Sequence, residues 1–186
     1  MNIEEQDLVE GCKSGKQDAY RRLYYTYASS LLHIIGRYIS DRSTAHDLLH
    51  DTFLKVFDKI GTFEYRGAGS LAAWLNRIAG NEALMHLRRE SRWVDFPAEE
   101  MNLKDETDNE EPEAELVQNL SYEQILSCIH RLPTGYRTVF ILYVIEGYSH
   151  KQIAETLGIA ERSSASQLSR ARKLLAKEIN LYNATN

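Results

Sequence analysis

A strongly acidic stretch divides this chain in two and limits what it can fold into. Residues 93–118 hold ten acidic residues against a single base, Lys104, and they include few large apolar side chains. A segment of this composition cannot bury enough apolar surface to offset the entropy lost on ordering, so we predict a flexible linker. The 186-residue chain is therefore expected to form two small domains, residues 1–92 and 119–186, instead of one large core.

The linker also explains the acidity of the chain as a whole. The formal net charge is −5, but residues 93–118 alone contribute −9, so the remaining residues together carry +4. Binding to a nucleic acid depends on where the basic residues lie and not on the net charge of the whole chain. The acidic composition therefore does not exclude a DNA-binding protein.

Cysteine usage and hydropathy predict a protein of the reducing cytoplasm. Cys12 and Cys128 fall in different domains without a CxxC or His-rich companion, which favours two buried free thiols over a disulfide or a zinc site. No apolar run approaches the roughly 20 residues of a membrane span, and the N-terminus is polar. We expect no membrane insertion, no metal and no cofactor.

Apolar residues recur three and four positions apart in both domains, which predicts an all-α protein with four helices in each domain. In the first domain the helices are expected over residues 3–15, over 18–39, from a cap at Asp41 or Ser43 to Ile60, and from a cap at Ser70 onward. Gly61 is expected to stop the third helix, and residues 61–69 to form an ordered surface loop. The apolar stripe of the fourth helix contains Leu71, Trp74, Leu75, Ile78 and Met85. Trp74 is therefore expected in the core.

In the second domain, helices are expected over residues 122–132, 136–145, 149–157 and 162–182. The last two have the features of a helix-turn-helix. Ser149 and Gln152 form a capping-box pattern, Ala154 is small enough for two helices to cross, and Gly158 tolerates the left-handed conformation of a tight turn. The second of these helices is rich in basic residues, so we predict that it contacts duplex DNA; an ordinary helix pair with a solvated basic face is the alternative.

Motifs in both domains resemble those of sigma factors of the extracytoplasmic-function (ECF) group. In the second domain the resemblance is carried by Leu132-Pro133, by residues 136–140, by Glu146-Gly147-Tyr148-Ser149 and by Leu157-Gly158-Ile159. In the first domain it is carried by residues 45–54, by 63–70, by 74–83 and by Leu87-Arg88-Arg89. Two motif sets in the expected order are more specific than either alone. The resemblance implies a promoter-specificity subunit with no catalytic site, whose partners are core RNA polymerase, promoter DNA and an anti-sigma factor.

The resemblance assigns roles to particular residues of the first domain. Asp47, His50 and Asp51 match the helix that docks on core polymerase; the two carboxylates lie four residues apart and hence on one helix face, where a basic partner can meet them. His50 stands where the family usually has Gln, which makes this docking mildly dependent on pH. The minus-10 element is expected to be read and melted by aromatic faces and cations of the loop and the following helix, namely Phe63, Tyr65, Arg66, Arg77, Asn81, Arg88 and Arg89.

The second domain is expected to read the minus-35 element through its last helix. Hydroxyl, amide and guanidinium groups there match base edges and phosphates, and the candidates are Arg162, Ser163, Ser164, Ser166, Gln167, Arg170, Arg172 and Lys173. Where the family's last helix often has Thr-Val-Lys-Ser-Arg, this chain has Ser163-Ser164-Ala165-Ser166-Gln167. The low charge of this segment predicts that the free protein binds promoters weakly and needs polymerase for full affinity.

Other functions fit parts of the sequence. His46 and His50 lie four apart on one helix, as in zinc peptidases with an HExxH motif, but Asp47 replaces the glutamate base and no third ligand stands out. A two-domain repressor would need a ligand pocket or a dimerisation helix, and neither is evident. A decoy that only sequesters an anti-sigma factor would have no use for the polymerase and DNA residues named above. The acidic linker is predicted to run through a basic polymerase channel as a nucleic-acid mimic.

Overall fold

The structure is a computed structural model that describes residues 3–90 and 120–185. It divides into two compact units, one ending at His86 and the other beginning at Leu87, and each is described here by itself. Every regular element in the described ranges is helical. The predicted all-α, two-domain organisation is confirmed, whereas the predicted linker at 93–118 lies outside the described residues.

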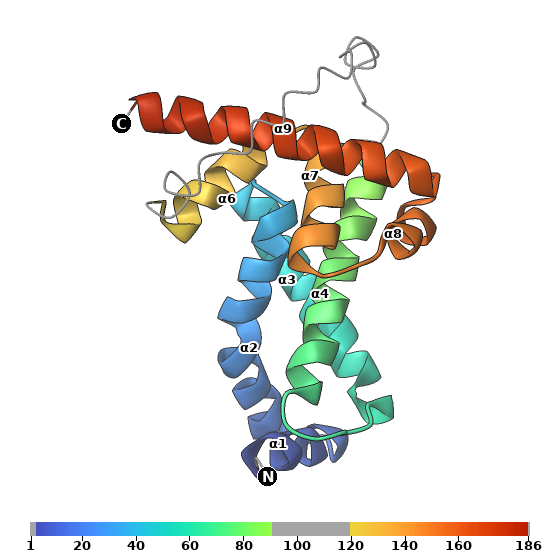
Figure 1. Cartoon of the computed structure of the whole chain (residues 1–186). Helices are drawn as coiled ribbons and strands as arrows, with labels where there is room; N and C mark the ends of the chain where they lie inside the picture. The colour runs from blue at the N-terminus through green and yellow to red at the C-terminus, as the bar shows by residue number, and fades with distance from the viewer. Residues whose placement is uncertain (1–2, 91–119, 186) are drawn as a thin grey trace. The chain divides into compact units, whose positions relative to one another are not determined.

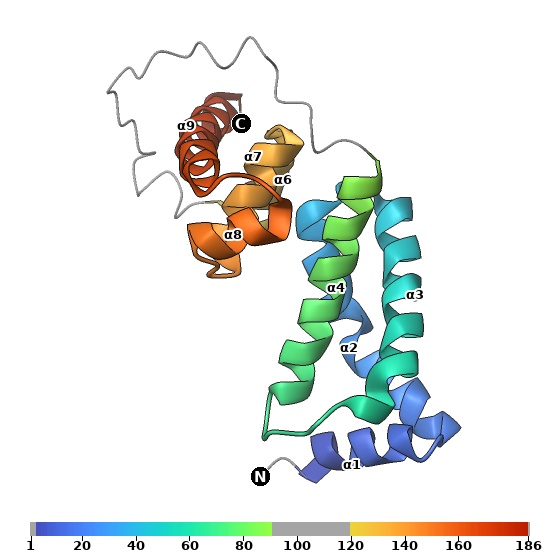
Figure 2. The ribbon, with the colours of Figure 1, turned by 90° about the vertical axis from the view of Figure 1, so that its right-hand side faces the viewer.

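The first unit contains α1 (Ile3–Lys13), α2 (Gln17–Tyr38), α3 (Arg42–Lys59), the 3-10 turn η1 (Ile60–Thr62) and all but the last three residues of α4 (Ser70–Arg89). Helices α2, α3 and α4 run alongside one another, and α1 lies across one end of the three, next to the loop that leads into α4 (Figures 1 and 2). The core between them is apolar and includes Leu23, Ile35, Phe53, Val56 and Leu75. The four predicted helices of this domain are present with bounds close to those expected.

Three local expectations in this unit have different outcomes. Asp41 is the cap of α3, because its carboxylate accepts the Thr44 N–H at 2.8 Å. Gly61 does not stop α3 by itself; the helix ends at Lys59 and tightens into η1. Ser70 is already the first residue of α4, and its hydroxyl accepts the Arg66 N–H at 3.2 Å, so it fastens the preceding loop instead of capping the helix.

Helices α1 and α2 approach each other closely at Gly11. A Cβ atom at this position would stand 2.8 Å from the Ala19 Cβ, a distance that real Cβ atoms essentially never show. We expect Gly11→Ala to lower the free energy of unfolding by about 1–3 kcal/mol through overpacking. Gly80 is the matched control, since it lies inside α4 and a Cβ atom added there would meet nothing within 4 Å. Gly80→Ala should instead stabilise the protein by about 0.5–1 kcal/mol, and equal midpoints for the two variants in urea unfolding would contradict the packing argument.

The second unit contains α6 (Tyr122–Arg131), α7 (Thr134–Phe140), a π-helical turn η3 (Ile141–Ile145), α8 (His150–Leu157) and α9 (Glu161–Thr185). The long helix α9 packs against α6, α7 and α8 (Figures 1 and 2). The helix predicted over 136–145 begins earlier and ends in the π turn, and the other predicted helices are confirmed. Cys12 and Cys128 are both buried free thiols, as predicted. Burial raises the pKa of each, which keeps both protonated at neutral pH.

Candidate functional site

The outer face of α3 carries the three residues predicted to dock on polymerase. Asp47, His50 and Asp51 are all exposed, and they recur at the spacing of one helix face. Leu54 continues this face one turn further and is 66% exposed. The structure thus brings the three predicted residues together and adds an apolar residue that the sequence analysis missed. The only signal in the sequence was an apolar residue placed three positions after Asp51.

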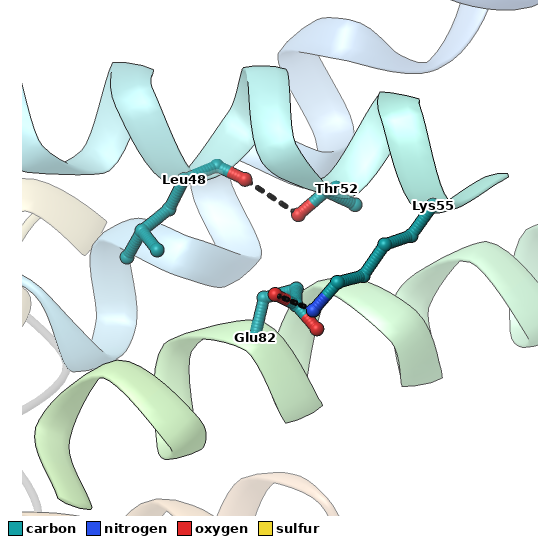
Figure 3. Close-up of polar contacts among 4 residues, drawn as sticks. All are labelled: Leu48, Thr52, Lys55 and Glu82. Carbon is teal, nitrogen blue, oxygen red and sulfur yellow. Dashed lines mark hydrogen bonds and ion pairs between the residues drawn. The ribbon is translucent and has the colours of Figure 1, made fainter. Parts of the chain in front are cut away.

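The side of α3 next to this face contacts α4. Lys55 donates to the Glu82 carboxylate, whose side chain is almost fully buried, and the Thr52 hydroxyl donates to the Leu48 carbonyl at 2.7 Å within α3 (Figure 3). A buried carboxylate is costly to leave unpaired, so this contact specifies how the two helices pack. The Lys55–Glu82 ion pair therefore links α4 to the helix that carries the docking face.

A pocket of about 520 Å³ lies between the loop after η1 and the first turns of α4. Phe63 and Trp74 supply its aromatic surface, with ring centroids 4.9 Å apart and ring planes inclined by 39°. Arg66 and Arg77 add two exposed guanidinium groups. The pocket is also lined by Thr62, Glu64, Ser70 and Ala73. Three of the predicted minus-10 residues, Phe63, Arg66 and Arg77, therefore meet in this pocket.

Two predictions for α4 are wrong because its apolar stripe is narrower than the sequence pattern suggested. Trp74 is only half-buried and lines the pocket, and Met85 is 48% exposed. The buried side of the helix is made instead by Leu71, Leu75, Ala79 and Ala83 with Glu82. The outward side carries residues at three- and four-residue spacing that include both Trp74 and Met85. We call it the α4 outer face, and it consists of Trp74, Arg77, Asn81, Met85 and Arg88.

Tyr65 does not present its polar end to the pocket. The residue is half-buried, and its hydroxyl is buried without a hydrogen-bond partner among the described residues. The ring of Tyr65 therefore points inward. The prediction that it offers a free aromatic face to an unstacked base does not agree with this conformation of the loop. The neighbouring Phe63 is 7% exposed, yet it lines the pocket. Arg89, the last residue of α4, is exposed.

In the second unit, α8, the turn and α9 form the predicted helix-turn-helix. Ser149 and Gln152 make both hydrogen bonds of the capping box, at 2.9 and 3.2 Å. Gly158 ends α8 with φ of +69°, the left-handed conformation expected for the turn. Among the candidate DNA-binding residues of α9, those with exposed side chains are Arg162, Ser166, Arg172 and Lys173. Ser163 and Arg170 are half-buried.

Two of the predicted minus-35 contacts are corrected by burial. Ser164 has 0% exposure, and its hydroxyl lies 3.0 Å from the His150 Nδ1 atom. The His150 ring in turn stacks on the Tyr143 ring, with centroids 4.5 Å apart. Gln167 is also buried. Because neither side chain faces solvent, neither can reach a base edge in this conformation. Ser164 instead fastens α9 to the start of α8.

Neither a membrane-crossing helix nor a metal cluster is present in the described part of the chain. No described helix combines the length and apolarity of a membrane-crossing segment. Within residues 3–90 and 120–185, no cluster of three or more His, Cys, Asp or Glu side chains is placed to hold a metal ion. His46 is half-buried and His50 exposed on α3.

Two family models match the chain in the order of its units. Residues 23–93 match sigma-70 region 2, and residues 122–175 match sigma-70 region 4. Together these two models of one family account for more than half of the chain. The chain belongs to the sigma-70 family. The first unit thus contains region 2, with the α3 face and the pocket, and the second contains region 4, with the helix-turn-helix.

Relatives place this sigma factor in the ECF group. It is 30% identical over 171 residues to the ECF RNA polymerase sigma factor BldN of Streptomyces coelicolor, covering 92% of this chain and 64% of that protein. It is 28% identical to the ECF RNA polymerase sigma-E factor of Haemophilus influenzae, covering 95% of this chain and 96% of that protein. Membership of this group makes it a promoter-specific transcription initiation factor that works with RNA polymerase.

A solved structure agrees with the fold of this sigma factor. The sigma factor RpoE of Bartonella quintana, in a co-crystal structure with the anti-sigma factor NepR, superposes with a TM-score of 0.51 at 21% identity, over 87% of this chain and 96% of that one. At this identity the likeness supports the fold alone. Residue roles must therefore be argued from this chain's own surfaces.

Proposed function

We propose that this sigma factor divides promoter recognition between its units, with the pocket and α4 outer face opening and reading the minus-10 element and α9 reading the minus-35 element. The carrying observation is the pocket. It joins two aromatic rings and two guanidinium groups at the start of a helix whose outer face continues with polar and basic side chains. This combination suits a nucleotide that has left the base stack.

The chemistry of the pocket fits strand opening step by step. Its volume of about 520 Å³ is ample for one base. Trp74 can stack on the base, with the buried Phe63 ring packed beside it, and such stacking contributes roughly 1–3 kcal/mol per base. Arg66 and Arg77 can neutralise the phosphates of the displaced strand. Energy gained only when the base is unstacked favours the open form of the promoter.

The helix-turn-helix supports sequence reading at the minus-35 element. The exposed residues near the start of α9, Arg162 and Ser166, lie where a recognition helix meets base edges in the major groove. Arg172 and Lys173 lie further along α9 and are suited to phosphates. Ser164 and Gln167 are excluded from this set by their burial.

We assign core polymerase binding to the α3 face formed by Asp47, His50, Asp51 and Leu54. Burying an exposed leucine side chain beneath a partner removes its apolar surface from water, a gain of about 1.5–3 kcal/mol. Leu54→Ala is expected to weaken affinity for core polymerase about tenfold, measured by competition with a labelled sigma factor. Tyr25→Ala is the control, because Tyr25 is 76% exposed on α2, outside this face. Equal affinity of the Leu54→Ala and Tyr25→Ala proteins would remove Leu54 from the docking surface.

The protein is proposed to act in the cytoplasm without a catalytic site of its own, the polymerase carrying out nucleotide addition. An anti-sigma factor is a proposed partner, because membership of the ECF group implies one. The acidic segment at 93–118, which is predicted to run through a channel of the polymerase, lies outside the described residues.

The proposed division of labour is tested by footprinting the holoenzyme on one promoter. Permanganate should detect unpaired thymines at the minus-10 element only when core polymerase and this protein are both present. Arg162→Ala combined with Arg172→Ala should remove protection of the minus-35 element while leaving opening on a premelted promoter intact. Loss of minus-10 protection instead would reverse the assignment of the two units.

A further inference from the structure

We propose that Glu5 is a positioning residue for promoter opening: its carboxylate, carried by α1, holds the loop at Gly69 and so keeps the pocket in the shape that receives the unstacked base. Neither the sequence motifs nor the family models assign a role to Glu5; the region 2 match begins only at residue 23. The inference rests on the proposed function of the pocket.

Glu5 is an unusual residue for its place in the chain. It lies in the first helix, yet it is only 8% exposed, although a carboxylate is costly to bury without partners. Its Oε2 atom accepts the Gly69 N–H at 2.9 Å, a contact between residues 64 positions apart. Figures 1 and 2 show why the two meet, since α1 crosses the end of the bundle beside the loop that enters α4.

The contact falls at the positive end of α4. The Gly69 carbonyl accepts the Ala73 N–H at 2.9 Å, so Gly69 is the residue from which α4 starts. A carboxylate at a helix N-terminus satisfies a free N–H and is favoured by the helix dipole. Gly69 itself has φ of +82°, a backbone conformation that residues with a side chain rarely adopt. In this conformation the Gly69 N–H faces α1. The loop thus supplies no side-chain cap of its own, and Glu5 acts as one from another helix.

Tyr27 of α2 joins the same cluster. Burial raises the pKa of its phenol, and the charge of Glu5 and a side-chain hydrogen bond with Glu5 raise it further. Tyr27 therefore stays protonated at neutral pH, which suits a hydrogen-bond donor to the carboxylate. Nearby Tyr65 also raises the Tyr27 pKa, which places the loop tyrosine close to this cluster. One carboxylate thereby ties α1 and α2 to the loop.

The Glu5–Gly69 hydrogen bond is connected to the pocket through the adjacent residue Ser70 and its hydrogen bond with Arg66. Ser70 follows Gly69 directly, lines the pocket, and accepts the Arg66 N–H at 3.2 Å. Arg66 lines the same pocket from the other end of the loop. Releasing Gly69 would free both Ser70 and Arg66 to shift, whereas the α3 docking face lies on another helix. Opening of the promoter should therefore depend on Glu5 more than binding of core polymerase does.

The test compares Glu5→Ala and Glu5→Gln with Asp7→Ala and Asp7→Asn, because Asp7 is an exposed acid on the same helix. Each protein is assembled with core polymerase, and two quantities are measured: affinity for core, and opening rate from a 2-aminopurine reporter in the minus-10 element. We expect Glu5→Ala to slow opening about tenfold, the effect of losing a hydrogen bond to a charged group, with core affinity unchanged within about twofold. The opening rate of Glu5→Gln should lie between those of Glu5→Ala and the wild type, since the amide oxygen still accepts from the Gly69 N–H. Both Asp7 variants should open promoters at the wild-type rate.

Several outcomes would overturn the inference. If Glu5→Ala opens the promoter at the same rate as Asp7→Ala, Glu5 does not position the loop. An equal loss of core affinity and opening shows a general structural role. If Glu5→Ala does not fold, as judged by its melting temperature, the comparison of Glu5→Gln with Asp7→Asn decides in the same way. If Trp74→Ala slows opening and Glu5→Ala does not, this inference fails while the proposed function stands; if neither slows opening, the proposed function fails.

The two tyrosines supply an independent check with opposite expectations. Tyr27→Phe removes the donor to the Glu5 carboxylate and should slow opening in the same direction as Glu5→Ala. Tyr65→Phe removes a buried hydroxyl that has no partner among the described residues, a change that costs nothing or stabilises. Equal slowing by Tyr27→Phe and Tyr65→Phe would contradict the proposed arrangement.

Discussion

Trp74→Ala is expected to slow promoter opening about 30-fold, because losing one base-stacking surface costs roughly 1–3 kcal/mol. The ring is half-buried at the pocket and packs 4.9 Å from Phe63, so its removal deprives the pocket of one of its two aromatic walls. The measurement is the rate of permanganate reactivity at the minus-10 element with saturating holoenzyme. Saturation separates opening from core binding, to which the α3 face contributes.

The conservative variant distinguishes stacking from folding. Trp74→Phe keeps an aromatic surface and should retain most of the opening rate, while its melting temperature should differ little from that of Trp74→Ala. A premelted promoter should show a smaller defect for Trp74→Ala than a duplex promoter does, since the cost of unstacking has already been met. If both variants open duplex promoters at the wild-type rate, Trp74 is only a packing residue.

The second large effect is expected at Ser164. Ser164→Lys places a charge at a position with 0% exposure beside His150, and the second unit should lose at least about 3 kcal/mol of stability, enough to unfold a small domain. Ser166→Lys is the matched control, because Ser166 is exposed two residues later on the same helix. That variant should fold with its thermal transitions intact, and any change in its affinity for minus-35 DNA should come with a steeper salt dependence.

Limited proteolysis and calorimetry of the full chain would report the outcome. We expect a lost thermal transition and rapid cleavage in the second unit for Ser164→Lys alone. If Ser164→Lys folds and binds the minus-35 element more tightly, then Ser164 faces DNA and its buried hydrogen bond with His150 does not form.

The sequence predicted well those features that depend on neighbours along the chain. The capping box at Ser149 and Gln152 and the left-handed Gly158 involve residues within one or two turns of each other, and the structure has both. The cap at Asp41 is local in the same way. The spacing of Asp47, His50 and Asp51 likewise required only that α3 be a helix. These predictions succeeded because helical geometry fixes them.

The sequence failed where burial is decided by distant partners. A serine on a basic helix looked like a DNA contact, but His150, 14 residues earlier, buries its hydroxyl. Met85 and Trp74 looked like core because periodicity cannot tell how wide a buried stripe is. Glu5 looked like an ordinary acid of a polar N-terminus, since its partner Gly69 lies 64 residues away. Each error concerns a contact between elements that no local pattern encodes.

Recognition of bipartite promoters together with RNA polymerase is the central property assigned to this protein. Run-off transcription with a bacterial core RNA polymerase on a randomised promoter library tests it most directly. We predict transcripts only when this protein is added, from templates that share two sequence elements at a fixed spacing. Arg162→Ala with Arg172→Ala should relax only the upstream element, and Trp74→Ala should reduce yield from all templates. Binding to core polymerase without any transcript from the library would contradict this assignment and would identify the protein as a decoy.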